Sequence, residues 1–571
     1  MASAETDTEL EMQHRSRLSA GSPPAQDFTA TKPDEEKTKS HRGFKFWGIF
    51  AALILSALVS ALDGSIVSTA LPTIVRDLNA GDDYVWVVNV YFLTSAAFQP
   101  LFGQLANIWG RRWLMIGSVA VFTLASGICG GASSTPMLII GRAVQGIGAG
   151  GINMLVDIII CDLLPLRERA NYVGLLFAVI SIGSAIGPFV GGVLAQHSTW
   201  RWIFYLNLPL GGLAMGLLFA FLRVSYRKDE TTQQKISRID FIGNGLLIAS
   251  TTSVLYSLTY GGTRYSWSDA RILSSLILGL IGFVIFYLYE RKPLFGDPVV
   301  PPRLFSNRTS SAAFFISFQN SVLTFWVIYF YPVYFQSVLN SSSTRAGVQL
   351  LPLSVVFPLF AALAGGAVTK TGRYKPFHII GFALLTLGIG CSSLLDADSP
   401  MAAWVVLLIV LAASLGLLIS TLLPAVQAGL PDSETAASGA TWAFVRSLGT
   451  IWGVSIPAAI FNNRFDQLSG RITDEASRAV LVGGKAYEYA SKDFINSFHD
   501  PTRAQVISVY ADSLKRVWQI GIVFAGVSFL AVFVEKEIKL RTDLETDYGI
   551  EEKKKVAPLE NGNGSAEAIQ K

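Results

Sequence analysis

The stretch MLIIGRAVQGIGAGGINMLVDIII, residues 137–160, is long and apolar enough to cross a bilayer, yet it contains an arginine, Arg142. A spanning helix needs about 20 consecutive residues that are mainly apolar. A guanidinium at the centre of such a helix costs about 2.5–3.5 kcal/mol on insertion scales, so it persists only where it faces protein or water. The stretch therefore predicts one helix of a multi-span bundle. Arg142 either serves a path for a polar species or ties two helices together.

The composition indicates an all-α membrane protein. Of the 571 residues, 51% are hydrophobic and 15% are charged, whereas a soluble protein carries about 25% charged residues. The 51 glycines suit close helix contacts in a membrane. A net charge of +4 does not indicate nucleic-acid binding. The three cysteines form no CxxC pair, so we predict no disulfide framework, no metal site and no cofactor.

Fourteen segments qualify as candidate spans, and the lysines and arginines of the short loops place the N-terminus in the cytosol. The spans begin near Trp47, Tyr84, Trp113, Met137, Tyr172, Trp202, Phe241, Ile272, Ser310, Gly347, Phe377, Ala402, Ser438 and Trp518. The predicted parts are a disordered cytosolic tail at 1–43, a six-helix bundle at 44–223, two linking transmembrane helices with cytosolic loops at 224–309, a second six-helix bundle at 310–536 with a long extracellular loop at about 461–516, and a cytosolic tail at 537–571.

The two bundles share a sequence repeat. GQLANIWGRR at 103–112 follows the second span, and GGAVTKTGRYK at 365–375 follows the tenth. Duplicated halves are typical of secondary transporters. We therefore expect the second bundle to repeat the fold of the first.

Four stretches carry a resemblance to a known family. They are LDGSIVSTALPTIV at 62–75, GQLANIWGRRWLMI at 103–116, RAVQGIGAGG at 142–151 and GSAIGPFVGGVL at 183–194. Together and in this order they resemble the signatures of the major facilitator superfamily, and among its members the fourteen-span drug:proton antiporters, especially the fungal toxin and multidrug efflux pumps. The resemblance covers residues 47–535 and implies a major facilitator fold.

Asp63 is the one acidic residue of the first span. It lies about 16 residues beyond Trp47, or about 24 Å along a helix that rises 1.5 Å per residue, which places it in the outer half. The resemblance implies that Asp63 couples proton movement to transport; a helix-end carboxylate bound to water is the alternative. Arg142 also lies in an outer half, so we expect it to pair with ionised Asp63. Gln145 shares the face of Arg142 at i+3.

The resemblance implies that the loop motif after the second span, at 103–112, acts as a cytosolic latch. Its two arginines, Arg111 and Arg112, would meet acidic groups at neighbouring helix ends, with Asp162 preferred and Glu168 second. Ordinary cytosolic anchoring of the arginines is the alternative. Asn107 stands where many members have Asp, which predicts a weaker electrostatic contribution. The proposed gate residues are Gly103, Asn107, Gly110, Arg111, Arg112 and Asp162.

The last of the four stretches, at 183–194, lies in the fifth predicted span and is called here the fifth-helix motif. It is a stripe of small residues with one proline. Small residues let two helices approach closely, and proline removes a backbone hydrogen bond. The resemblance implies an antiporter seal, and plain helix packing would have the same sequence. The residues are Gly183, Gly187, Pro188, Gly191 and Gly192.

Aromatic and polar residues of the spans are candidates for a substrate cavity, because an apolar cavity with aromatic walls suits hydrophobic compounds. For any one aromatic residue, lipid contact or core packing is the commoner role. The candidates are Tyr91, Gln145, Phe325, Trp326, Tyr329 and Arg446. For Asp157, also within an apolar segment, we favour a position near the lipid headgroups over the inner cavity.

Energy for transport must come from an ion or substrate gradient, because no G-x-x-x-x-G-K-[ST] nucleotide loop is present. We expect a proton-coupled exporter of drugs, toxins or secondary metabolites, monomeric, in the plasma membrane or else the vacuolar membrane. Its partners would be a hydrophobic small molecule, protons and lipid. Uptake of a siderophore or other specific solute is the alternative, a transporter-like sensor is less favoured, and an enzyme is not expected. Asn340 begins a glycosylation sequon on an outer loop.

Overall fold

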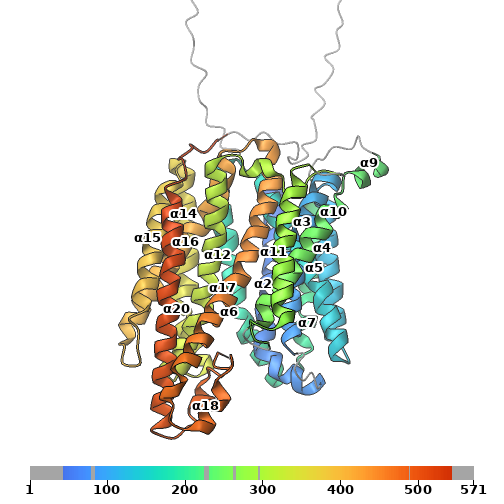
Figure 1. The fold of residues 1–571 in the computed structure, drawn as a ribbon. Helices are drawn as coiled ribbons and strands as arrows, with labels where there is room; N and C mark the ends of the chain where they lie inside the picture. Colours follow the sequence, from blue (N-terminus) through green and yellow to red (C-terminus); the bar gives the residue numbers. More distant parts are fainter. Residues whose placement is uncertain are drawn as a thin grey trace, which may run out of the picture. The chain divides into compact units, whose positions relative to one another are not determined.

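The computed structural model describes residues 43–78, 84–223, 231–261, 265–292, 296–487 and 489–542 (Figure 1). The described residues from Phe46 onward belong to one compact unit. Within the described ranges the secondary structure is helical apart from an isolated β-bridge between Gly261 and Tyr265. The predicted all-α class is therefore confirmed. The predicted tail at 1–43 lies outside the described residues except for Gly43.

Within the described residues, the first bundle is formed by six long helices that are rich in apolar residues. Gly110 separates two of them with a φ of 83°, a left-handed conformation that glycine adopts without strain. The long helices are α2 (Phe44–Leu78), α3 (Tyr84–Trp109), α4 (Arg111–Gly130), α5 (Thr135–Leu163), α6 (Leu166–His197) and α8 (Asn207–Phe221), with the short α7 (Trp202–Tyr205) before α8.

The linking pair and the second bundle follow the same pattern. The pair consists of α10 (Phe241–Tyr260) and α11 (Ala270–Glu290), preceded by the short α9 (Thr232–Ser237). The long helices of the second bundle are α12 (Arg308–Val333), α14 (Leu351–Thr371), α15 (Lys375–Ser392), α16 (Met401–Ala428), α17 (Thr435–Leu468) and α20 (Thr502–Val532). Short elements between them are η2 (Pro302–Phe305), η3 (Tyr334–Val338), α13 (Ser343–Gln349), η4 (Asp432–Glu434), η5 (Ser469–Arg471), α18 (Glu475–Leu481) and α19 (Lys492–Ile495).

Thirteen of the described helical segments are long and apolar enough to span a membrane. α3 is not among them; it is 26 residues long and includes the polar residues Asn89, Gln99 and Gln104. It packs against α5 inside the first bundle. With α3 the long helices of the described part number fourteen, which equals the number of spans expected from the sequence.

The two bundles meet along a defined set of helices. α6 packs against α14 and α16, and α17 packs against α3 and α5. α10 contacts both α3 of the first bundle and α17 of the second, so the linking pair is not a free tether. One apolar core accordingly contains residues of both bundles, such as Met154 of α5 and Trp442 of α17.

The connection between α17 and α20 is shorter than the predicted loop at about 461–516. α17 continues to Leu468, and α20 begins at Thr502 rather than near Trp518. The extra turns are stabilised by aromatic packing, with the ring of Tyr510 5.6 Å from Phe461 and 5.0 Å from Phe465. The sequence pattern missed this because the added turns are amphipathic rather than apolar throughout.

The chain after α20 is bound to the ends of other helices. The Tyr374 hydroxyl donates to the carbonyl of Lys536 at 2.8 Å, and burial, together with the Glu535 carboxylate, raises the pKa of this phenol. The Arg167 backbone N–H donates to the carbonyl of Arg541 at 3.1 Å. Leu540 is 2% exposed. The predicted cytosolic tail at 537–571 thus begins with ordered residues up to 542, and its remainder lies outside the described part.

Candidate transport and gating sites

Arg142 of α5 and Asp63 of α2 form a fully buried ion pair. Nη1 of Arg142 lies 2.5 Å from Oδ2 of Asp63, and both side chains are 0% exposed. Nε of Arg142 donates to the Val87 carbonyl at 3.0 Å, and the guanidinium lies 4.2 Å from the centre of the Tyr91 ring. The sequence predicted this pair, and the structure brings the two residues together.

The second oxygen of Asp63 is also occupied. Oδ1 accepts hydrogen bonds from Nε2 of Gln145 at 2.8 Å and from Nδ2 of Asn207 at 2.7 Å. Ser126 of α4 accepts a further bond from Gln145 at 2.7 Å. Asn207 and Ser126 received no role from the sequence. The sequence could have identified Asn207 as a candidate site residue, because it is a polar residue inside the mainly apolar stretch WRWIFYLNLPLG at 200–211.

Glycines bring α5 close enough to α3 for this site to form. A Cβ atom added at Gly146 would lie 2.1 Å from Oγ1 of Thr94, and one at Gly150 would lie 2.4 Å from the Ser95 carbonyl. Neither distance is sterically allowed, so the two helices contact backbone to backbone. The glycine-rich sequence around Arg142 therefore fixes its depth relative to Tyr91.

The loop motif contains the predicted contact between Arg111 and Asp162. Nε of Arg111 lies 2.8 Å from Oδ2 of Asp162, with the side chains 1% and 3% exposed. Nη1 also donates to the Ala106 carbonyl at 2.8 Å, and Nη2 lies 3.5 Å from Oδ1 of Asn107. Gly103 faces the second bundle, because an added Cβ would lie 2.5 Å from Cβ of Ala440.

Arg112 differs from its predicted role. Nη2 donates to the Phe219 carbonyl at 2.9 Å, and the guanidinium lies 5.3 Å and 5.4 Å from the ring centres of Trp113 and Phe219. These contacts are with a carbonyl and two rings rather than with an acidic group. For Arg112, these contacts agree with the alternative role, ordinary anchoring at the cytosolic side, rather than with a role in the latch.

The repeat in the second bundle makes the mirrored contact. A Cβ added at Gly365 of α14 would lie 2.5 Å from the carbonyl of Ala170 on α6. Nε of Arg167 donates to the Thr369 carbonyl at 2.7 Å, and Arg373 pairs with Glu537 at 2.7 Å. Each copy of the motif thus contacts a helix of the opposite bundle.

The fifth-helix motif lies on α6 and faces α2 within the first bundle. Added Cβ atoms would lie 2.6 Å from Cδ1 of Leu58 at Gly183 and 2.0 Å from Oγ of Ser65 at Gly187. These contacts are close helix packing, and a role as a seal stays a prediction. Gly191 is buried on the same helix. The surroundings of Pro188 and Gly192 lie outside the described part of the chain.

The aromatic cavity candidates occupy different environments. Trp326 is 0% exposed and packs against Phe524 with ring centres 5.5 Å apart, as a core residue does. Phe325 and Tyr329 stack at 6.1 Å, and Tyr329 is 39% exposed. Tyr91 is buried under Arg142. Trp326 and Tyr91 are therefore closed off in this conformation.

Asp157, for which the sequence favoured a position near the headgroups, is buried against the second bundle. Asp157 is 1% exposed, and Oδ2 lies 3.2 Å from Nη2 of Arg446 on α17. The Arg446 guanidinium lies 4.6 Å from the centre of the Phe177 ring and 4.7 Å from the centre of the Trp442 ring. The second bundle supplies the partner that allows this carboxylate to be buried.

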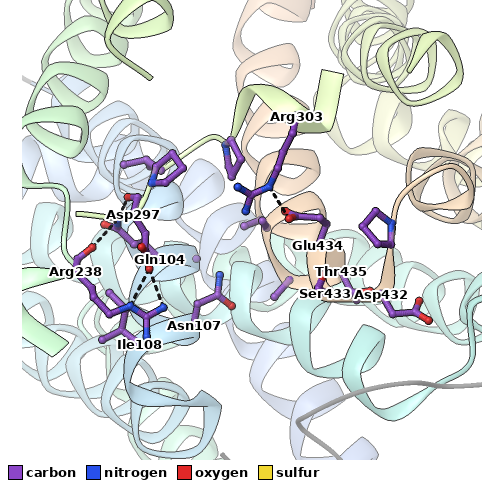
Figure 2. A pocket seen from close by; sticks show the side chains of 18 of the residues that line it. Gln104, Asn107, Ile108, Arg238, Asp297, Arg303, Asp432, Ser433, Glu434 and Thr435 are labelled. Carbon is purple, nitrogen blue, oxygen red and sulfur yellow. Dashed lines mark hydrogen bonds and ion pairs between the residues drawn. The ribbon is translucent and has the colours of Figure 1, made fainter. Parts of the chain in front are cut away.

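A cavity of about 680 Å3 opens where the loop motif, the linking segment and the second bundle meet (Figure 2). Nε of Arg238 donates to Oδ2 of Asp297 at 2.8 Å, and Nε of Arg303 lies 2.5 Å from Oε1 of Glu434. Figure 2 shows these side chains at the cavity. Nε2 of Gln104 donates to the Asp297 carbonyl at 2.6 Å. Because ion pairs line this cavity, it does not suit an apolar substrate. We therefore assign the cavity to the region where the loop motif contacts the second bundle.

Asn340 follows η3 with a φ of 52°. Ser342 of the same sequon accepts a bond from the Arg345 backbone N–H and thereby caps α13. Glycosylation of Asn340 stays a prediction.

Residues 53–454 match the family model of the Major Facilitator Superfamily. The chain belongs to the Major Facilitator Superfamily. It is therefore a multi-pass membrane transporter, as the sequence motifs predicted.

Curated members of the superfamily are similar over almost the whole chain. The MFS-type efflux transporter phmH of Phaeosphaeria nodorum is 55% identical over 542 residues, which are 93% of each chain. The MFS-type efflux transporter ffsH of Aspergillus flavipes is 52% identical over 568 residues, or 99% of this chain and 98% of that protein. The MFS-type efflux transporter pyiT of Pyricularia grisea is 51% identical over 538 residues, or 92% of this chain and 89% of that protein.

Solved structures of the superfamily share the fold. The human organic anion transporter MFSD10 aligns with a TM-score of 0.54 at 12% identity, covering 85% of this chain and 99% of that one. The proton:xylose symporter XylE aligns with a TM-score of 0.53 at 16% identity, covering 87% and 97%.

Proposed function

We propose that this transporter exports hydrophobic small molecules, such as drugs, toxins or secondary metabolites, in exchange for protons across the plasma membrane. The observation that carries the proposal is the buried Asp63–Arg142 pair with Gln145 and Asn207 around it. An ionisable pair at 0% exposure within a spanning helix bundle is costly and marks a path for ions or protons. The efflux transporters that are similar over the full length support the export direction.

The chemistry of the exchange resides in the Asp63 carboxylate. A proton from the outer side converts the carboxylate to a neutral carboxylic acid, while the guanidinium of Arg142 stays beside it as a hydrogen-bond donor. The ion pair then becomes a hydrogen bond between a neutral group and a cation, so the helices that carry the two residues are held less tightly. Release of the proton to the cytosol restores the pair. Cargo moves outward in the other half of the cycle.

The test uses the purified protein in liposomes loaded with a lipophilic rhodamine dye. A pH difference, acidic on the side that corresponds to the cell exterior, is imposed, and dye movement is followed by fluorescence. Asp63→Asn should abolish dye movement driven by the pH difference. Asp77→Asn is the matched control, because Asp77 lies on the same helix and its carboxylate accepts a bond from Trp200 at 2.8 Å.

Two results would count against the proposal. Dye movement that does not depend on the imposed pH difference would exclude proton coupling. Full pH-driven movement in Asp63→Asn would show that protons couple elsewhere. Fluorescence microscopy of the transporter fused to a fluorescent protein, in fungal cells, would show whether it lies in the plasma membrane or in the vacuolar membrane.

A further inference from the structure

Asp157 and Arg446 form the contact between the two bundles that the proton-coupling model above leaves without a role. Asp157 is on α5 of the first bundle, and Arg446 is on α17 of the second. Their side chains are 1% and 20% exposed, and Oδ2 and Nη2 lie 3.2 Å apart. Because separation of α5 from α17 must break this ion pair, its state is linked to the opening of the interface.

The Asp157 carboxylate is much less well compensated than that of Asp63. Asp63 receives bonds from three side chains, at 2.5, 2.8 and 2.7 Å. Asp157 has one partner at 3.2 Å, and its Oδ1 is buried with no hydrogen-bond partner among the described residues. A buried ion pair is favourable only when good geometry and further hydrogen bonds compensate the loss of hydration. In this conformation the buried charge of Asp157 therefore has fewer compensating contacts than that of Asp63.

The depth of Asp157 differs from that of the outer site. It follows Arg142 by 15 residues on the same helix, which is about 22 Å at 1.5 Å per residue. Six residues further on, α5 ends at Leu163, at the end where Asp162 contacts the loop motif. Asp157 thus lies toward the cytosolic end, while Asp63 lies toward the outer one.

Arg446 does not depend on Asp157 alone. The rings of Phe177 from α6 and Trp442 from α17 lie within 4.7 Å of its guanidinium, and cation–π contacts of this kind stabilise a desolvated cation. Loss of the Asp157 charge therefore removes the inter-bundle attraction without leaving the guanidinium unsupported.

The other charged groups near Asp157 have partners of their own. Asp162 on the same helix pairs with Arg111 of α4. Arg169 of α6 donates to Oε1 of Gln427 on α16 at 2.7 Å. The thiol of Cys161 lies 3.8 Å from the same Gln427 oxygen. Arg446 is the cation that faces Asp157 from α17.

We propose that the Asp157–Arg446 ion pair is a second proton site and acts as a latch between the bundles on the cytosolic side. A proton added to the Asp157 carboxylate forms a neutral O–H group and breaks the ion pair, so α5 and α17 separate and the pathway opens to the cytosol. Loss of that proton to the cytosol re-forms the pair and closes the pathway. The inference rests on the proposed proton-coupled function, of which it is the cytosolic step.

Cys161 provides a native reporter for this opening. It is 0% exposed and lies at the inter-bundle contact with Gln427. Replacement of the other two cysteines, Cys129→Ala and Cys391→Ser, leaves Cys161 as the single thiol. The rate of its reaction with N-ethylmaleimide in inside-out vesicles then measures how often the cytosolic side is open.

The comparison is between the parent and Asp157→Asn in this background, from about pH 8 to about pH 6, a range in which a buried carboxyl can titrate. Dividing the parent rate by the Asp157→Asn rate cancels the pH effect that the two proteins share. Because the Asp157 charge also acts directly on the Cys161 thiol, Arg446→Gln, which keeps that charge and removes the latch, should likewise react faster than the parent. At about pH 8 we expect Asp157→Asn to react about tenfold faster, which corresponds to about 1.4 kcal/mol. As the pH falls, the ratio should rise toward one. Asp157→Glu should retain this pH dependence.

The matched control is Ser447→Ala, which removes the neighbouring inter-bundle bond to Oε1 of Gln99 at 2.9 Å without changing a titratable group. It should keep the pH dependence of the parent. A ratio that does not change with pH, or an Asp157→Asn variant that reacts no faster than the parent, would overturn the proposal. Asp63→Asn separates the two proposals: it should lose pH-driven transport yet retain the pH dependence of Cys161 labelling. If Asp63→Asn transports normally, the proposed function fails at Asp63 while the labelling result still decides the latch.

Discussion

Arg142→Gln should destabilise the folded protein strongly, because it leaves the Asp63 carboxylate buried without its cation. Removing one partner of a buried ion pair costs about 3–5 kcal/mol. The Asp63–Arg142 pair is 0% exposed on both sides, so no solvent screening reduces this figure. Loss of the Arg142 contact with the Tyr91 ring, 4.2 Å away, adds to it, since a desolvated cation–π contact contributes about 2 kcal/mol. The amide donors of Gln145 and Asn207 remain on the other carboxylate oxygen and offset part of the loss.

The double variant Asp63→Asn/Arg142→Gln has no buried charge, and it should therefore be more stable than Arg142→Gln alone. The assay is unfolding in detergent followed by reaction of the buried Cys129 thiol, which lies 3.8 Å from Gln145. Both variants should lose pH-driven dye transport. Arg112→Gln is the control, because its guanidinium contacts a carbonyl and ring faces near the surface. If Arg142→Gln were no less stable than Arg112→Gln, or the double variant no more stable than the single, the pair would not be the buried charge site that we describe.

Three further predictions concern contacts away from this site. Arg111→Ala should lower stability by about 3–5 kcal/mol in detergent unfolding, because it leaves the buried Asp162 unpaired. Gly146→Ala should reduce the amount of folded transporter seen in gel filtration, since an added Cβ meets the backbone of α3, whereas Gly117→Ala, with nothing within 4 Å, should be neutral. Truncation after Val532 should lower the melting temperature, because the contacts of the following segment with Tyr374 and the other helix ends are lost.

The sequence predicted the number and order of the helices because each depends on local composition. A run of about 20 apolar residues specifies a span regardless of its neighbours. The end of α17 and the start of α20 were mispredicted because their extra turns are held by Phe461, Phe465 and Tyr510 from different parts of the chain. Such packing does not leave a period in the sequence that hydropathy alone can detect.

The two buried charge pairs show where sequence reasoning about the site reaches its limit. Asp63 and Arg142 belong to one bundle, so counting residues along antiparallel helices was enough to place them at one depth. Asp157 and Arg446 belong to different bundles and are 289 positions apart, and their pairing depends on how α17 of the second bundle packs against α5 of the first. Without that packing, a carboxylate near the end of an apolar helix is most simply assigned to the headgroups.

In the mechanism that we propose, this difference suits the two pairs to different tasks. A pair within one bundle, such as Asp63–Arg142, can keep its partners while the bundles move as units, so it can hold or release a proton in either orientation. A pair between bundles, such as Asp157–Arg446, exists only while the bundles are in contact at that depth. Proton binding at the first site alone would change the charge of the carrier without favouring one orientation. Proton binding at the second changes the contact free energy between the bundles directly, since a ligand shifts a conformational equilibrium only by its difference in affinity for the two states. An exchanger built on both pairs can therefore convert a proton gradient into a preferred orientation.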